Sequence, residues 1–359
     1  MTRPSRVVID KQALIHNINR VREIAPTSKV MAVIKADAYG HGIVRVAQTL
    51  KEADAFGVAC LEEAELLRAS DITNTIVLLE GPHKAIDLKR IMALNLEIIV
   101  HNENQVESLE QTKLEQPLQV WLKIDTGMHR LGVPLEKAKA ILQRLEECSN
   151  VKPNIRLMTH FATANEHDNP LTQKQLDAFN QICKEFDNEK TLANSAAVIN
   201  FSDTHAEWIR PGLMLYGVSP MKNGIAKDHG LKPVMTLESE IISIQHLQEG
   251  DSVGYGATWH CPENMPVGVV AAGYGDGFPR HAKSGTPILV NDVRCSLIGR
   301  ASMDMLTVDL RNQPDAKIGD RVVLWGENLP IEEIAQHADT IPYQLLCGVH
   351  KRLEFVEHG

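Results

Sequence analysis

Short apolar runs alternate with longer amphipathic segments from the start of the chain to about residue 230. Eight of these runs have the length of a buried strand: 30–35, 56–60, 76–80, 96–101, 120–125, 155–161, 192–195 and 209–216. Between them, apolar residues recur at helical spacing in segments such as 43–51, 62–69, 85–94, 135–147 and 173–186. This alternation is typical of βαβ units and predicts an α/β fold with a TIM-type (β/α)8 barrel, although a doubly wound open sheet would have the same pattern.

The pattern changes at about residue 234 to short strands separated by turns. The expected strands are 238–247, 252–256, 267–272, 288–298, 305–310 and 320–325, with turn signals at 249–250, 291–292 and 318–320. Only Ile331–His337 has a helical pattern here. We therefore expect a barrel over residues 1–233 and a mostly β C-terminal domain over 234–359. A further strand at Val7–Ile9 could pair with either domain.

The composition of the 359-residue chain is that of an ordinary globular protein, with 43% hydrophobic and 23% charged residues. A net charge of -9 and the lack of a Lys/Arg run give no surface suited to nucleic acid. The six cysteines are scattered without a C-x-x-C pair, which fits a reducing compartment. Polar residues interrupt Met1–Val21, so no export signal or membrane span is visible. We expect a cytoplasmic enzyme or binding protein with neither nucleic-acid nor membrane partners.

Lys35 stands at the end of a predicted buried strand, and a glycine-rich loop and a helix from about Ile43 follow it. Barrel strands point their carboxyl ends at the active-site face, so a barrel would place Lys35 in a pocket. Burial there would lower the pKa of the lysine and favour a Schiff base with an aldehyde. Taken alone, however, a lysine at a strand end is more often a solvated cap.

The segment around Lys35, VIKADAYGHG (33–42), resembles the cofactor-lysine motif of bacterial alanine racemases. The resemblance continues in order through LKIDTGMHRLG (122–132), THFA (159–162), ANSA (193–196), IRPGL (209–213), VGYGAT (253–258), GYGDG (273–277), SMD (302–304) and IPY (341–343). One such motif would be a weak signal. The ordered set covers nearly the whole chain and is specific.

The resemblance implies the fold-type III architecture of this family, an eight-stranded barrel followed by a β domain. It also implies a pyridoxal 5'-phosphate cofactor and the interconversion of L-alanine and D-alanine, either to supply D-alanine for peptidoglycan or in alanine catabolism. Members form head-to-tail homodimers in which the β domain of one subunit closes the barrel mouth of the other. The active site is then shared between the subunits.

Several residues match family positions that hold the cofactor. They are Lys35 for the Schiff base; Tyr39, Ser195 and Tyr343 for hydroxyls at the phosphate; Gly212 and Leu213 for backbone amides there; Arg210 at the pyridine nitrogen; and His160 beside Arg210. Several donors at loop and helix starts suit a phosphate dianion. Arginine remains protonated in proteins, so Arg210 would donate a hydrogen bond to the ring without protonating it.

Racemisation needs one proton removed from one face of the α-carbon and another delivered to the opposite face. The resemblance assigns one face to Lys35 and the other to Tyr255 of the partner subunit. Tyrosine has an unperturbed pKa of about 10 and is a poor base near neutrality. In the family pattern His160 lies next to this tyrosine and bridges it to Arg210, so a cationic neighbourhood would favour the phenolate.

Four further residues match family positions at the substrate. In many members the lysine matching Lys123 is a carbamate, N6-carboxylysine, which orients the arginine matching Arg130 to bind the substrate carboxylate. A plain buried lysine also occurs at this position. Met303 and Asp304 of the partner subunit match residues at the substrate entrance and carboxylate. A close methionine would favour a methyl side chain, although one methylene is worth only about 1–3 kcal/mol.

Each of these positions also has an ordinary interpretation in isolation. These are a helix N-cap for Ser195, a surface turn for Arg210, a hydrogen-bonded buried histidine for His160, a turn aromatic for Tyr255, and an exposed charge cluster for Lys123 with Arg130. The ordered set of motifs favours a cofactor and substrate site at these positions over the ordinary interpretations.

Other motifs and functions are weaker. Gly273–Gly277 imitates a dinucleotide fingerprint, but Pro279 spoils the helix that must follow. His160 and His167 lack a recognised ligand spacing, so we expect no metal. Three functional alternatives stay open: a non-catalytic carrier of the same cofactor, a decarboxylase of the same fold type, and a racemase acting on serine or lysine. The β domain argues against the carrier, and Arg210 argues against the decarboxylase.

Overall fold

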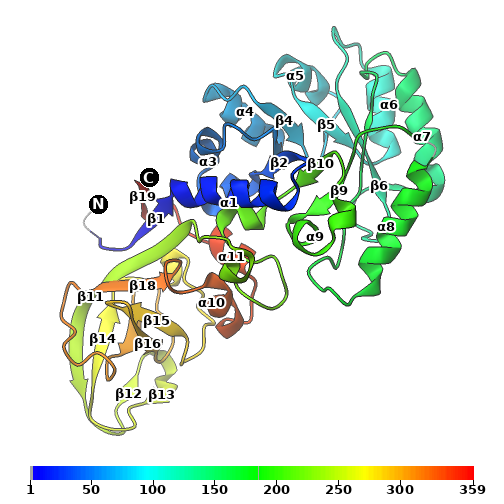
Figure 1. Cartoon of the computed structure of the whole chain (residues 1–359). Coiled ribbons are helices and arrows are strands. Elements are labelled where there is room, and N and C mark those ends of the chain that lie inside the picture. The colour runs from blue at the N-terminus through cyan, green and yellow to red at the C-terminus, as the bar shows by residue number, and fades with distance from the viewer. Residues whose placement is uncertain (1–2, 185) are drawn as a thin grey trace.

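The N-terminal part of the chain is a closed ring of eight parallel strands surrounded by helices (Figure 1). The structure, a computed structural model, describes residues 3–184 and 186–359. The ring strands are β2 (Lys29–Val33), β3 (Ala55–Val58), β4 (Thr75–Leu78), β5 (Glu97–Val100), β6 (Val120–Asp125), β8 (Arg156–Met158), β9 (Lys190–Asn194) and β10 (Trp208–Arg210), and β7 (Val133–Pro134) pairs with β6 outside the ring. Pairing of β5 with β6 and of β10 with β2 closes the ring and excludes an open doubly wound sheet. The prediction of a (β/α)8 barrel is confirmed.

The barrel interior is a packed core. Seven ring strands each contribute one side chain to a separate apolar cluster: Met31, Ala55, Val77, Ile99, Trp121, Met158 and Trp208. The rings of Trp121 and Trp208 meet edge to face with centroids 5.5 Å apart, and the Arg156 guanidinium lies 4.8 Å from the Trp121 ring. Because the interior is filled, a site can form only where the strands end.

Helices connect the ring strands and cover the outside of the barrel (Figure 1). They are α1 (Lys11–Ile24), α2 (Lys35–Gly40), α3 (Ile43–Thr49), α4 (Leu61–Ala69), α5 (Asp87–Ala93), α6 (Glu103–Gln111), α7 (Leu135–Glu147), α8 (Pro170–Cys183) and α9 (Ser195–Asn200). Short 3-10 helices are η1 (Ser202–Thr204), η2 (Leu213–Tyr216), η3 (Ala226–His229), η4 (Tyr255–Ala257) and η5 (Tyr274–Asp276).

Several predicted elements of the barrel differ in extent from the structure, among them the strand expected over 155–161, which is β8 and ends at Met158. The helix expected over 173–186 is α8, which starts earlier because Pro170 suits its first turn and Asn169 is its N-cap. Glu185, inside the predicted range, lies outside the described residues. The strand expected over 209–216 is wrong beyond Arg210, because Pro211 has no amide to donate to the sheet and the chain turns into η2.

A second, mostly antiparallel sheet forms the β domain (Figure 1). Its strands in spatial order are β14 (Met265–Val270), β17 (Leu306–Asp309), β16 (Val293–Leu297), β15 (Pro287–Val290), β18 (Arg321–Trp325), β11 (Met235–Leu247), β1 (Arg6–Asp10) and β19 (Glu354–His358). The early strand β1 lies in this sheet, antiparallel to β11 and parallel to β19. The N-terminal strand therefore belongs with the β domain and not with the barrel.

Three predictions for the β domain need correction. The run 288–298 is two strands, because Asn291 and Asp292 have φ of 48° and 64° and make a hairpin turn. The strand expected over 252–256 is the two-residue β12 (Ser252–Val253), which pairs with β13 (Trp259–His260). The β domain also has two helices instead of one.

The helices of the β domain are α10 (Ile331–His337), as predicted, and α11 (Pro342–Cys347), which was not predicted from the sequence. The six residues of α11 are too few to display helical periodicity, although Pro342 is favourable at a helix start. Within residues 3–184 and 186–359, none of the helices combines the length and the apolar content needed to cross a membrane.

Candidate active site at the barrel mouth

The predicted cofactor residues gather where the ring strands end. Lys35 follows β2, Lys123 lies in β6, His160 follows β8, Ser195 follows β9, and Arg210 ends β10 just before Gly212 and Leu213. Tyr39 lies in α2, Arg130 lies in the loop after β6, and Tyr343 comes from α11, which contacts α2. Parallel strands bring these residues together although they are far apart in the sequence.

Four consecutive residues after Lys35 adopt a left-handed conformation. The φ angles along Ala36–Tyr39 are 54°, 52°, 54° and 53°. Such a residue costs roughly 1–2 kcal/mol, so other contacts must hold the turn. The Glu63 carboxylate accepts hydrogen bonds from the backbone amides of Ala36 at 2.7 Å and Ala59 at 2.8 Å. Glu63 thereby ties the turn beside Lys35 to the end of the next ring strand.

A column of aromatic rings runs from the core to the barrel mouth. His41 stacks on Tyr216 with centroids 4.5 Å apart, Tyr216 contacts Tyr39 at 4.8 Å, and Tyr39 contacts Tyr343 at 5.8 Å. The Tyr216 hydroxyl donates to the Val33 carbonyl at 3.0 Å. Burial raises the pKa of Tyr39 and of Tyr343, so both hydroxyls stay protonated and can donate.

Ser195, Gly212 and Tyr39 border one small polar space. The Ser195 Oγ accepts from the Gly212 amide at 2.8 Å. A methyl group on Gly212 would lie 2.6 Å from the Tyr39 hydroxyl, so a side chain there would push the Tyr39 ring aside. The N-cap of α9 is Asn194, whose side chain accepts from the Ala197 amide at 3.0 Å. The interpretation of Ser195 as an N-cap is therefore wrong, and its hydroxyl lies beside Gly212 instead.

Arg210 is 4% exposed and is held by the barrel wall. Its Nη1 donates to Thr191 Oγ1 at 2.6 Å, and its Nη2 donates to the Thr159 carbonyl at 2.7 Å and to His160 Nδ1 at 3.2 Å. Burial lowers the pKa of Arg210 to about 9, which still leaves it charged at neutral pH. Arg210 therefore does not lie in a surface turn.

The protonation of His160 follows from this contact. Burial, and then the Arg210 cation, hold the pKa of His160 well below its ordinary value, so the ring is neutral. Arginine can only donate, so His160 Nδ1 is the acceptor and the proton of the neutral ring lies on Nε2.

Lys35 and Lys123 lie in a crowded cationic environment. Burial and then Arg130 lower the pKa of Lys35, whereas Glu80 raises it. Lys123 is 7% exposed, and burial followed by Arg210, Arg130 and Lys35 lowers its pKa to about 8. Both amines are therefore easier to deprotonate than an exposed lysine. Lys123 is buried and does not belong to an exposed charge cluster, whereas Arg130 is exposed.

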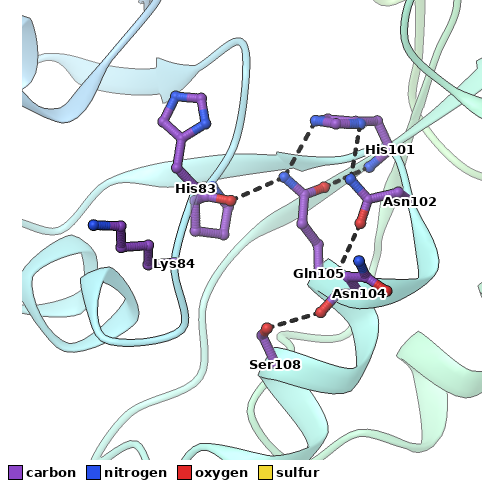
Figure 2. Close-up of a pocket in the computed structure, with 8 residues that line it drawn as sticks. His83, Lys84, His101, Asn102, Asn104, Gln105 and Ser108 are labelled. Carbon is purple, nitrogen blue, oxygen red and sulfur yellow. Dashed lines mark hydrogen bonds between the residues drawn. The ribbon is translucent and has the colours of Figure 1, made fainter.

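A shallow polar pocket of about 170 Å³ lies on the rim, between the segments that follow β4 and β5 (Figure 2). Gln105 lines it and donates from Nε2 to the carbonyls of Glu80 at 3.2 Å and Pro82 at 3.1 Å. Its Oε1 accepts from the His101 amide at 2.9 Å. These bonds fix the loop that carries Glu80, the carboxylate that raises the pKa of Lys35.

Tyr255, Met303 and Asp304 do not join this cluster within one chain. Figure 1 shows β12 and β13, between which Tyr255 lies, at the end of the β domain away from the barrel. Tyr255 is 70% exposed and Met303 is 54% exposed. The Asp304 carboxylate is bound by Arg352 Nη2 at 2.8 Å, inside the β domain.

Four residues that shape the site were not predicted from the sequence: Glu63, Glu80, Gln105 and Tyr216. Glu63 and Gln105 belong to helices whose polar faces look solvated in the sequence. Tyr216 falls in the predicted strand 209–216, which ends at Arg210 in the structure. The one available signal was the position of Glu80 at the end of an apolar run, where barrel enzymes place functional side chains.

The chain combines a closed barrel with a β domain, and lysine, arginine and tyrosine side chains gather at the barrel mouth. This arrangement is that of a barrel enzyme. The family models for the alanine racemase N-terminal domain and C-terminal domain match residues 9–220 and 234–357. The chain therefore belongs to the alanine racemase family, whose members are isomerases.

Individual relatives are similar over nearly their whole length. An alanine racemase from Nitrosococcus oceani is 52% identical over 97% of this chain and 98% of its own. A biosynthetic alanine racemase from Escherichia coli is 48% identical over 97% of each chain. The crystal structure of biosynthetic alanine racemase from Pseudomonas aeruginosa is 42% identical, covers 100% of both chains and superposes with a TM-score of 0.97.

Proposed function

We propose that this chain interconverts L-alanine and D-alanine with pyridoxal 5'-phosphate held at the barrel mouth. The observation that carries the proposal is the space bordered by Ser195, Gly212 and Tyr39, where any side chain on the glycine would collide with a tyrosine hydroxyl. Hydroxyls and backbone amides beside a helix start suit a phosphate dianion. The residues present therefore fit this cofactor.

The remaining groups of the mouth complete the cofactor site. We assign to the phosphate the hydroxyls of Tyr39, Ser195 and Tyr343 and the amides of Gly212 and Leu213, with the Gly212 amide exchanging Ser195 Oγ for a phosphate oxygen. Arg210 uses Nη1 and Nη2 for the barrel wall, which leaves its Nε–H to donate to the pyridine nitrogen. When bound, pyridoxal phosphate supplies an aldehyde that condenses with an amine and a ring that stabilises negative charge on the α-carbon. Lys35, with its lowered pKa, supplies the amine of the protein.

Two residues move protons on opposite faces of the α-carbon in this proposal. The Lys35 amine serves one face, and Tyr255 of the partner subunit serves the other, with the roles exchanged in the reverse direction. A head-to-tail homodimer is needed because Tyr255 is exposed and far from Lys35 within one chain. The Nε2–H of His160 is the donor that would stabilise the phenolate of the partner's Tyr255.

The substrate carboxylate would be bound by Arg130, oriented by a carbamate on Lys123. A neutral Lys123 amine can add to CO₂, forming an N–C bond and releasing one proton. The lowered pKa supplies the neutral amine, and the surrounding cations favour the resulting anion. Enzyme incubated with ¹³CO₂ should give a carbamate ¹³C resonance that is missing in Lys123→Met.

Met303 and Asp304 of the partner subunit would border the substrate, with the methionine favouring a methyl side chain. A racemase for serine or lysine is the nearest alternative, because size discrimination is limited.

The relatives named biosynthetic support a role in supplying D-alanine for peptidoglycan, with alanine catabolism as the alternative. We place the enzyme in the cytoplasm, since all six cysteines are free thiols.

A chiral-product assay in heavy water tests the function. Purified protein with added pyridoxal phosphate and L-alanine should give D-alanine carrying deuterium at the α-carbon. Lys35→Ala should keep its circular dichroism spectrum but lose both the turnover and the visible absorbance of the bound cofactor. The same assay with L-serine and L-lysine identifies the preferred substrate. Release of CO₂ in place of D-alanine would support the decarboxylase instead, and a lack of turnover on all three amino acids would refute the proposal.

A further inference from the structure

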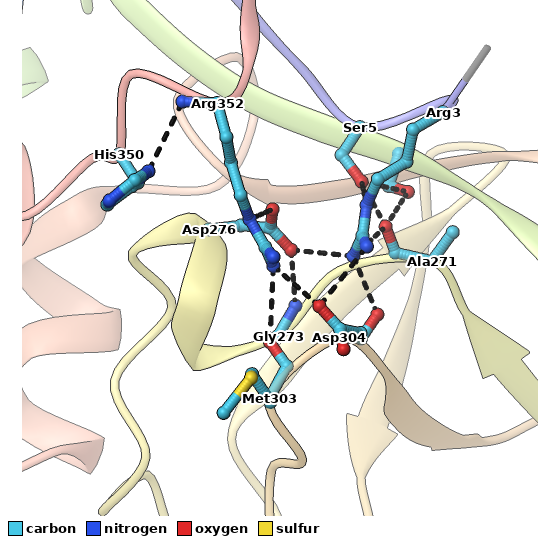
Figure 3. A network of polar contacts seen from close by, with 10 residues as sticks. Arg3, Ser5, Ala271, Gly273, Asp276, Met303, Asp304, His350 and Arg352 are labelled. Atoms are coloured by element: carbon cyan, nitrogen blue, oxygen red, sulfur yellow. Dashed lines mark hydrogen bonds and ion pairs between the residues drawn. The ribbon is translucent and has the colours of Figure 1, made fainter.

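A buried carboxylate in the β domain joins both ends of the chain to the 302–305 loop (Figure 3). The Asp276 side chain is 0% exposed. It accepts hydrogen bonds from Arg3 Nη2 at 2.8 Å, from Arg352 Nε at 2.8 Å and from the Gly273 amide at 2.9 Å. A buried carboxylate without such partners would be strongly destabilising, so Asp276 requires both arginines.

The two arginines come from opposite ends of the sequence but from neighbouring strands. Arg3 precedes β1 and Arg352 precedes β19, and these strands pair in parallel with Arg6 opposite Glu354. The sheet therefore brings both guanidinium groups to the same buried carboxylate (Figure 3).

Each arginine also binds the 302–305 loop. Arg352 Nη2 donates to the Asp304 carboxylate at 2.8 Å and to the Met303 carbonyl at 3.4 Å. Arg3 donates to the Asp304 carboxylate at 3.3 Å and to the Asp304 carbonyl at 2.8 Å. The loop cannot shift without breaking charge-assisted hydrogen bonds to groups that are also fixed by a buried ion.

These hydrogen bonds hold the side chain of Asp304 but leave the side chain of Met303 free of polar contacts among the described residues. The Asp304 carboxylate is already held by two cations, and the hydrogen bond from Arg352 lowers its pKa, so it stays ionised. The Met303 side chain is 54% exposed, and Figure 3 shows it turned away from Arg3. The network thus fixes the loop backbone while the methionine remains available to another surface.

We propose that Asp276, Arg3 and Arg352 are positioning residues that fix the 302–305 loop so that Met303 limits the size of the substrate. This inference rests on the proposed function, in which the partner's Met303 borders the alanine side chain. The three residues act through the loop and contact no reacting atom. Loosening the loop should therefore weaken substrate binding and size discrimination without slowing proton transfer.

Arg352→Lys is the variant of choice because it keeps the charge but cannot bridge Asp276 and the loop with two separate nitrogens. Arg294→Lys is the matched control, since Arg294 makes an exposed bidentate pair with Glu333 at 2.6 Å elsewhere in the same sheet. For Arg352→Lys we expect KM for L-alanine to rise roughly tenfold, kcat to stay within about twofold, and the kcat/KM preference for alanine over serine to fall roughly tenfold. Arg294→Lys should match the unmodified enzyme.

Hydrogen exchange gives a second readout that needs no turnover. The amides of Tyr274 and Gly275 donate to the carbonyls of Ser302 and Met303 at 3.0 and 2.9 Å. Peptides covering 271–276 and 300–306 should exchange faster in Arg352→Lys and in Arg3→Lys, but not in Arg294→Lys.

The two measurements separate failure of this inference from failure of the proposed function. An enzyme that does not racemise alanine would refute the function, while hydrogen exchange would still test the network. An active Arg352→Lys with unchanged KM, unchanged alanine preference and unchanged exchange would overturn the inference. A parallel loss of kcat and thermal stability, with KM and preference unchanged, would assign the network a purely structural role and overturn it as well.

Discussion

His41 is a buried histidine at the inner end of the aromatic column. Its Nδ1 lies 3.0 Å from the carbonyls of Ala38 and Tyr39, and its ring stacks on Tyr216. Carbonyls only accept, so Nδ1 carries the proton, while Nε2 is buried without a partner among the described residues. Burial lowers the pKa of His41 to about 4. The folded protein therefore holds this residue neutral well into the acid range.

We expect His41 to make the protein less stable as the pH falls from about 6.5 to 4. In this window the unfolded chain binds a proton that the folded chain rejects, which lowers the free energy of unfolding by about 1.4 kcal/mol per pH unit. His41→Phe keeps a ring beside Tyr216 but cannot titrate. It should be less stable at neutral pH, because the hydrogen bond that Nδ1–H shares between two carbonyls is lost, and its stability should depend less on pH. Urea unfolding at stepped pH measures both slopes, and equal slopes would contradict the assignment.

At the scale of elements, the left-handed turn after Lys35 concentrates backbone strain beside the proposed reactive amine. Ala36 is exposed and has φ of 54°, so its side chain gains little from packing and bears the strain. Gly40 has φ of 80°, and a Cβ there would collide with the Leu346 carbonyl of α11. Glycine should therefore make the protein more stable than alanine does at both positions, so Ala36→Gly and Gly40→Ala should change the free energy of unfolding in opposite directions.

We expect Ala36→Gly to raise the free energy of unfolding by about 1 kcal/mol, because glycine adopts this conformation without strain. Gly40→Ala should lower it by more than that amount, because a positive φ and a clash with α11 are combined. Guanidinium unfolding of the two variants beside the unmodified chain measures both effects. A shift of the same sign in both variants would show that the turn is not the source of the strain.

At the scale of the whole molecule, the proposed site needs two subunits. Lys35 lies at the barrel mouth, whereas Tyr255 is exposed on the β domain, away from the barrel. A heterodimer of Lys35→Ala and Tyr255→Phe chains would have one site with both defects and one with none. After complete subunit exchange, the mixture should recover about a quarter of the full activity.

The matched control for this mixing experiment pairs Lys35→Ala with Arg130→Ala. Both defects then lie on the barrel side, so neither site of the heterodimer is intact and no activity should return. The experiment requires verified subunit exchange, for example by mass-labelled chains. Equal recovery in both mixtures, or no recovery in the first, would refute the shared site.

The order and class of the elements and the position of the main candidate residues follow from the amino-acid sequence alone. The barrel strands could be predicted because strand length and apolar pattern are local properties. Lys35 could be placed at the mouth because the carboxyl ends of all barrel strands lie at the same face of the barrel, and Lys35 follows such an end. The family motifs, each a few residues long, then marked Arg210, Ser195 and Tyr343.

Which side chains bind one another depends on how the whole chain folds. Glu63 binds the amide of Ala36, which is 27 residues away, and Asp276 joins arginines 273 and 76 residues away. Such contacts form only when the ring and the sheet close, so no local pattern reveals them. The same closure put β1 in the second sheet, because an isolated strand is compatible with either partner until hydrogen bonding and burial select one.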